Sequence, residues 1–129
     1  MIVLDTRALL YWVGGGDELS QAARAAIDRA LEGGGVAIST ASALEVAQYV
    51  ESGHLALSMD TRSWLSTLVS IEGVRMVPVD TAIAVRAASM SSALSSYQRM
   101  VAATARTLDI ALVTPDPKVG QLAHVETIW

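Results

Sequence analysis

The stretch Met1-Ile-Val-Leu-Asp5-Thr6-Arg-Ala-Leu-Leu-Tyr-Trp12 opens the chain and decides its fold. Residues 2–4 are apolar throughout, which is typical of a short strand that is buried on both faces of a parallel sheet. Asp5 follows that strand directly. Ligands of open parallel sheets lie beyond the carboxyl ends of the strands, so this position is the first place to look for functional groups.

Similar short apolar runs recur along the chain and alternate with longer segments of helical period. The expected strands are residues 2–4, 36–38, 75–77 and 111–113, with a weak edge strand over 125–128. The expected helices are a segment that Ser20 caps and Gly33-Gly34-Gly35 ends, followed by 42–51, 60–70, 81–90 and 97–108. This alternation predicts one α/β domain over residues 1–129, in which 2–4 and 111–113 are inner strands of a central parallel sheet.

Composition narrows the class of protein. With 52% hydrophobic and 17% charged residues among 129, the chain is neither disordered nor a charged tail. The net charge of −4 argues against binding nucleic acid by bulk charge. Cysteine is absent, and we expect a cytoplasmic protein without a membrane segment, because no apolar run approaches ~20 residues. The high hydrophobic fraction also predicts self-association.

Three acidic residues follow predicted strands and point toward one edge of the sheet. Asp5 ends the first strand, Asp116 follows the strand 111–113, and Glu45 lies in the helix after 36–38. Carboxylates packed together repel one another unless a cation neutralises them. Because all the donors are oxygens, the favoured ions are Mg²⁺ and Mn²⁺, which support hydrolysis of a phosphodiester.

Each acid also has a purely structural interpretation. Asp-Thr pairs occur at 5–6, 60–61 and 80–81, and Asp before an apolar run is an ordinary helix cap. Glu45 could face solvent on its helix, and Asp116, between two prolines, could be a turn residue. The metal-site hypothesis therefore rests on the joint placement of the three acids.

Four segments of the chain together resemble, in order and spacing, the PIN domain of VapC-type toxins. They are the opening stretch to Trp12, Ser39-Thr-Ala-Ser-Ala-Leu-Glu45-Val-Ala, Arg99-Met-Val-Ala-Ala-Thr-Ala105 and Leu112-Val-Thr114-Pro-Asp116. The resemblance implies a three-layer α/β/α fold and a dimeric ribonuclease toxin that is paired with an antitoxin and uses Mg²⁺ or Mn²⁺. It also implies that Asp5, Glu45 and Asp116 are the metal-binding and catalytic acids, with Thr6 and Thr114 as supporting hydroxyls.

The sequence departs from the family pattern at two positions. The family usually has an Asp-Arg pair at the start of the helix near Tyr97 and another Asp three residues earlier, whereas this chain has Gln98-Arg99 and Ser95. Gln98 can still offer a carbonyl oxygen to a metal, but it brings no charge. Arg99 is a candidate partner of phosphate or carboxylate, or a helix-surface charge.

Two functions remain open at this stage. The first is a metal-dependent ribonuclease, and the second is a degenerate PIN domain that serves as a binding or dimerisation module. An antitoxin segment is expected to dock between helices 42–51 and 60–70, where exposed Leu44, Tyr49, Trp64 or Leu68 would mark the groove. His54 and His124 are assigned to surface or loop positions. The core or a subunit interface is expected to hold the tryptophans and four methionines: Trp12, Trp64, Trp129, Met59, Met76, Met90 and Met100.

Overall fold

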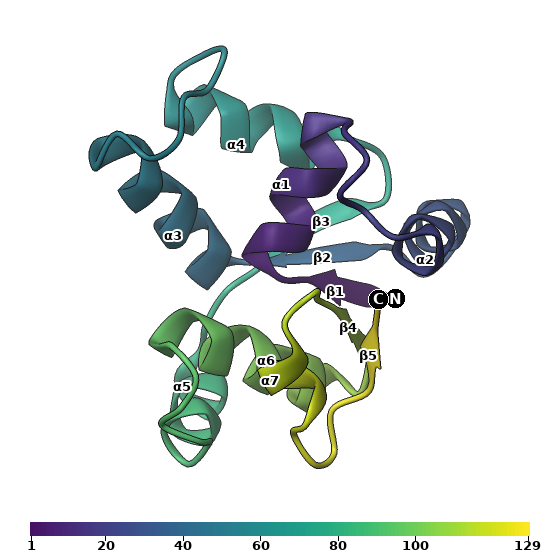
Figure 1. The fold of residues 1–129 in the computed structure, drawn as a ribbon, viewed down its shortest axis with the longest axis vertical. Helices are drawn as coiled ribbons and strands as arrows, with labels where there is room; N and C mark the ends of the chain where they lie inside the picture. The colour runs from purple at the N-terminus through teal and green to yellow at the C-terminus, as the bar shows by residue number, and fades with distance from the viewer.

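Strand β1 (Ile2–Leu4) is the middle strand of a five-stranded, fully parallel sheet in the computed structural model, which describes residues 1–129 (Figure 1). The strand order is β3-β2-β1-β4-β5. The other strands are β2 (Val36–Ser39), β3 (Val74–Val77), β4 (Ala111–Val113) and β5 (Thr127–Ile128). The expected inner strands β1 and β4 are therefore confirmed, and β1 is buried along its whole length.

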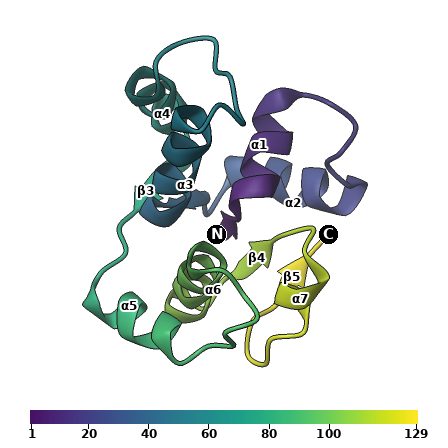
Figure 2. The same ribbon diagram turned by 60° about the vertical axis from the view of Figure 1, so that its left-hand side comes forward.

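Helices cover both faces of the sheet, as the resemblance implied. The helices are α1 (Thr6–Gly14), α2 (Gln21–Glu32), α3 (Thr40–Glu51), α4 (Thr61–Ser70), α5 (Thr81–Ala88), α6 (Ser96–Leu108) and α7 (Pro117–Gly120). One core packs α1, α2 and α4 against the sheet, and a second core packs α6 and α7 against the opposite face. Figures 1 and 2 show α1 and α6 on opposite sides of the strands. No helix has the length and apolar character needed to span a bilayer.

Most helix boundaries follow from a polar residue that accepts a backbone N–H. Ser39 caps α3, so this helix begins at Thr40 and not at 42 as predicted. Asp60 and Asp80 cap α4 and α5 by accepting from Ser63 N at 3.0 Å and Ile83 N at 2.9 Å. For these two Asp-Thr pairs the structural interpretation is confirmed.

Helix α1 (Thr6–Gly14) is not among the expected helices, and two short elements also differ from the prediction. Residues 125 and 126 do not belong to strand β5, which consists of Thr127–Ile128 alone. The chain forms a single helical turn, α7, where only a turn was considered, because Asp116 caps it and Pro117 supplies a helical φ at its first position. This turn fixes where Asp116 lies.

The helical period of the sequence did not distinguish which apolar side chains of α3 and α4 are buried and which are exposed. Leu68 is only 3% exposed and belongs to the core beneath α4, so the prediction that it marks a docking groove is wrong. Leu44 is 51% exposed and Tyr49 is 36% exposed on α3, while Trp64 is half-buried against the core. α4 packs on β3, and Leu68 lies in the same core as Val74 of that strand.

The histidines, tryptophans and methionines considered in the sequence analysis are divided between core and surface. His54 and His124 are exposed, as expected. Partly buried side chains that pack against the cores are Trp12, Trp64, Met76, Met90 and Met100. Met59 and Trp129 are 42% and 40% exposed, so the core interpretation is wrong for these two side chains.

Candidate active site

The register of β1 and β4 places two functional residues side by side. Leu4 is paired with Val113, so the residues that follow them, Asp5 and Thr114, leave the sheet together. The Thr114 hydroxyl donates to Asp5 Oδ2, and the backbone N–H of Ala8 donates to Asp5 Oδ1 at 2.8 Å. Asp5 is therefore both the cap of α1 and a carboxylate with one oxygen directed away from that helix.

Asp5 lies in an unusual electrostatic environment for a carboxylate. Its side chain is only 7% exposed. Burial raises the pKa of Asp5, and this effect outweighs the opposing hydrogen bonds from Thr114 and Ala8 and the charge of Arg7; the negative charge of Glu45 raises the pKa further. The ionised carboxylate therefore lacks sufficient compensation from the protein.

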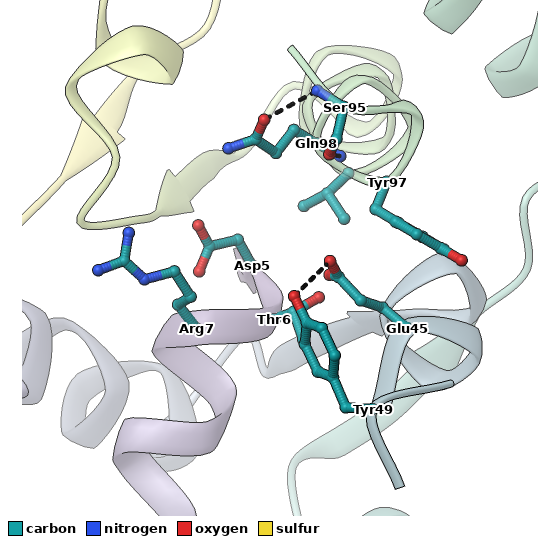
Figure 3. Close-up of a pocket in the computed structure, with 9 residues that line it drawn as sticks. Asp5, Thr6, Arg7, Glu45, Tyr49, Ser95, Tyr97 and Gln98 are labelled. Atoms are coloured by element: carbon teal, nitrogen blue, oxygen red, sulfur yellow. Dashed lines mark hydrogen bonds between the residues drawn. The ribbon is translucent and has the colours of Figure 1, made fainter. Parts of the chain in front are cut away.

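Asp5 and Glu45 face a common cavity of about 250 Å³ at the carboxyl edge of the sheet (Figure 3). α1 and α3, which follow neighbouring strands, bring the two acids there. The full lining is Asp5, Thr6, Arg7, Glu45, Tyr49, Ser95, Tyr97, Gln98 and Val101. The cavity thus joins residues that lie far apart in the sequence, from residues 5–7 to residues 95–101.

Two tyrosines form the side of the cavity away from Asp5. Tyr49 donates its hydroxyl to Glu45 Oε2 at 3.0 Å, and Tyr97 donates to Gln48 Oε1. Burial, followed by the bond to Glu45 and its negative charge, raises the pKa of Tyr49, so the phenol keeps its proton and orients the Glu45 carboxylate.

Asp116 is linked to Asp5 although it does not line the cavity. Its backbone N–H donates to Thr114 Oγ1 at 3.1 Å, and the same hydroxyl donates to Asp5. Asp116 Oδ1 accepts from Lys118 N at 2.9 Å and caps α7. Thr114 therefore lies between two of the three predicted acids, which is the supporting place expected for its hydroxyl.

Ser95 and Gln98 form a single structural unit at the start of α6. Ser95 Oγ accepts from Gln98 N at 3.1 Å, and Gln98 Oε1 accepts from Ser95 N at 2.9 Å, which together make a capping box. Gln98 Nε2 donates to Asp116 Oδ2 at 2.5 Å. The carbonyl oxygen that we expected to be available to a metal is thus engaged by the helix cap, and the amide nitrogen faces the acids instead.

The two arginines considered for this site have different positions. Arg99 lines a separate groove between α5 and α6, where it donates to Ser96 Oγ at 3.3 Å, so the structure does not bring it to this cavity. Arg7 lines the cavity beside Asp5 (Figure 3). A hydrogen bond to Tyr11 raises the pKa of Arg7, and Asp5 and Asp116 raise it further. Arg7 is therefore the cation of this site.

Thr6 contributes to the framework and does not bond to any of the acids. Its hydroxyl donates to Ser42 Oγ at 3.0 Å in the buried junction of α1 and α3. This contact joins the helices that carry Asp5 and Glu45 and fixes their separation. Sequence reasoning missed Arg7, Tyr49 and Tyr97 as lining residues of this cavity. Tyr49 lies four residues after Glu45, a helical spacing that could have indicated it, whereas only the fold places Arg7 and Tyr97.

The donor set suits a hard divalent cation. Asp5 and Glu45 offer carboxylate oxygens to one cavity, and the buried charge of Asp5 is undercompensated. Asp5, Glu45 and Asp116 are each hydrogen-bonded within the protein, and no group of three His, Asp or Glu side chains is placed so that it could hold a metal. The residues therefore fit a cation by the chemistry of their oxygens, and binding one through all three acids requires their side chains to rearrange.

Comparison with known proteins matches the chain to one family. Residues 2–125 match the PIN domain family. The chain is 30% identical to Ribonuclease VapC22 of Mycobacterium tuberculosis over 132 aligned residues, which cover 99% of this chain and 98% of the relative.

Solved structures show the same fold at lower identity. The crystal structure of VapBC2 from Rickettsia felis, bound to a DNA fragment from their promoter, includes a chain with a TM-score of 0.73 and 14% identity, covering 98% of this chain and 97% of that one. FitAcB from Neisseria gonorrhoeae gives a TM-score of 0.66 at 22% identity, with 98% and 96% covered.

Proposed function

The chain belongs to the PIN-domain family, in its VapC-type branch, and we propose that it is a divalent-metal-dependent endoribonuclease, the toxin of a VapBC-type toxin–antitoxin pair. The observation that carries this proposal is the buried, undercompensated Asp5 carboxylate that shares a cavity with Glu45. Burying such a charge costs stability and is reasonable where a cation or a reacting group offsets the cost.

Asp5, Glu45 and Asp116 would hold the ion, Mg²⁺ or Mn²⁺. A divalent ion there supplies a more acidic bound water and neutralises charge that develops on the phosphodiester. The protein's own residues prepare this site. Thr114 orients Asp5, Tyr49 orients Glu45, and Arg7 offers a guanidinium to the incoming phosphate.

The proposed partners are RNA, a cognate antitoxin and a second copy of the chain. A bound cation would allow this acidic protein, with its net charge of −4, to approach a polyanion. The exposed apolar residues of α3, Leu44 and Tyr49, suit an antitoxin segment. Such a toxin would act in the cytoplasm, where its RNA substrates are.

One observation favours the alternative of a degenerate PIN domain that binds partners without cutting RNA. The α6 side of the cavity carries the neutral pair Ser95 and Gln98, which leaves three acids for the site. Fewer carboxylates hold a divalent ion less tightly. The experiment below distinguishes these two functions.

The test is RNA cleavage by purified protein with Mg²⁺ or Mn²⁺ and with EDTA. We expect cleavage only with metal, and a loss of roughly 100-fold or more in Asp5→Asn, because changes even in the partners of metal ligands cost 10–100-fold. Asp28→Asn makes the same charge change on the exposed face of α2 and should cleave like the parent. Equal cleavage in EDTA, or full activity in Asp5→Asn, would contradict the proposal; no cleavage under any condition would support the binding module.

A further inference from the structure

The side-chain amide of Gln98 is held in one orientation from both ends. Its Oε1 accepts from the Ser95 backbone N–H at 2.9 Å, and its Nε2 donates to Asp116 Oδ2 at 2.5 Å. If the amide were turned over, its NH₂ would face the Ser95 N–H donor and its oxygen would face the carboxylate. Both contacts would then be repulsive, so Gln98 presents an N–H group to the acids.

An acidic side chain at this position would behave in the opposite way. A carboxylate in place of the amide would place two negative groups within hydrogen-bond distance, and such a pair needs a shared proton or a cation between them. The Gln98 amide needs neither, because it donates to Asp116 directly. The hydrogen bond therefore provides the attraction that a bridging cation would otherwise supply.

The charges of the site support the same conclusion. Three carboxylates, Asp5, Glu45 and Asp116, and one guanidinium, Arg7, sum to −2, which one divalent ion neutralises. A second ion would leave the site with a net positive charge in partly buried surroundings. Each Asp116 oxygen accepts one hydrogen bond from the protein and keeps a lone pair, so Asp116 can still contribute to a single ion.

We propose that the Gln98 amide replaces a cation between position 98 and Asp116, so that this protein binds one divalent ion and Gln98 acts as a positioning residue for Asp116. This inference rests on the proposed function, since it specifies the cation requirement of the same site. Ser95 contributes to this arrangement because its backbone N–H holds the Gln98 oxygen and so turns the amide nitrogen toward the carboxylate.

The decisive variant is Gln98→Glu, which keeps the length of the side chain and an oxygen for the Ser95 N–H. Glutamate is a normal partner in a capping box, so the start of α6 is preserved while the donor to Asp116 becomes a second carboxylate. Gln21→Glu adds the same charge at the exposed first position of α2 and serves as the matched control.

Calorimetric titration with Mn²⁺ should give one ion per chain for the parent and for Gln21→Glu. We expect Gln98→Glu to bind a second ion, or to bind one ion at least about tenfold more tightly, because a neutral donor has become a charged ligand. Thermal melts provide an independent readout. In EDTA, Gln98→Glu should melt below the parent, and Mn²⁺ should raise its melting temperature by more than it raises that of the parent.

A residue that only caps α6 would not produce this dependence on metal. The inference is overturned if the parent binds two ions, if Gln98→Glu matches the parent in both titration and melting, or if neither protein binds Mn²⁺. RNA cleavage tests the proposed function separately. A parent that binds one ion and cuts no RNA refutes the nuclease but leaves the role of Gln98 intact, whereas an active parent with two ions refutes only the role of Gln98.

Discussion

Both sides of the cavity are formed at the capped start of a helix, but one side carries a carboxylate and the other carries neutral side chains. Asp5 caps α1, and Ser95 caps α6. Asp5 uses one oxygen for the cap and keeps the other for Thr114 and the site, whereas Ser95 and Gln98 use their oxygens on each other. A helix cap therefore becomes a site residue only where an additional oxygen remains and burial leaves its charge undercompensated.

Among variants that leave the three acids in place, the largest expected effect follows from breaking the contact that joins Asp5 to Asp116. Thr114→Val removes a hydroxyl that donates to Asp5 and accepts from Asp116 N. Cleavage should fall by roughly 10–100-fold, as for other residues that orient metal ligands. Since the Thr114 bond lowers the pKa of Asp5, its loss should also move the onset of activity to higher pH.

The pH profile of RNA cleavage measures both effects. Thr114→Ser keeps the hydroxyl and should retain the parent profile. If Thr114→Val has the parent's rate and pH profile, the function of Asp5 does not depend on this contact. The difference between the Asp5 side and the Ser95–Gln98 side of the cavity is then smaller than the structure indicates.

A smaller effect is expected on stability, with the opposite sign to the effect on activity. Because burial raises the pKa of Asp5 in the fold, ionised Asp5 costs stability above that pKa, and the cost disappears as the pH falls below the ordinary value of 3.8. In EDTA at pH 7, Asp5→Asn should raise the melting temperature by roughly 4 °C, the shift that about 1 kcal/mol produces in a domain of this size.

Melting curves at pH 7 and near pH 3 test this prediction, since the gain should vanish at the lower pH. The exposed variant Asp28→Asn should show no such gain at pH 7. A lower melting temperature for Asp5→Asn at pH 7 would mean that the carboxylate stabilises the fold. The Asp5 cap of α1 and the Ser95 cap of α6 would then differ in charge, but the Asp5 cap would carry no cost in stability.

The smallest expected effect is on KM for RNA and comes from replacing Arg7, the basic residue beside Asp5. Arg7→Ala removes the basic residue that lines the cavity, and KM for RNA should rise about two- to fivefold, in line with the 0.2–1 kcal/mol typical of exposed charge pairs. Arg24→Ala, on the exposed face of α2, is the control. The difference between the two variants should shrink at high salt; equal KM values for both variants at low salt would exclude Arg7 from phosphate binding.

Much of the architecture could be predicted because it depends on local patterns. Apolar runs identify β1 and β4, and parallel strands bring Asp5 and Thr114 to one edge. The resemblance to the family was confirmed over residues 2–125. The assignment of Asp5, Glu45 and Asp116 to a metal remains a prediction, although the fold brings two of them to one cavity and links the third through Thr114.

The sequence by itself determined which residues could begin a helix, end a strand or carry charge, since these properties depend on neighbours along the chain. Only the tertiary structure decided which polar atoms meet. Arg7 lies in the cavity and Arg99 outside it, although both are helix residues close to expected functional groups. Gln98 donates to Asp116 because the start of α6 packs beside the end of β4 and its oxygen is already engaged by Ser95. The direction of these hydrogen bonds depends on the partner at each end: Ser95 is a neighbour within the capping box, whereas Asp116 is distant in the sequence and meets Gln98 only in the fold.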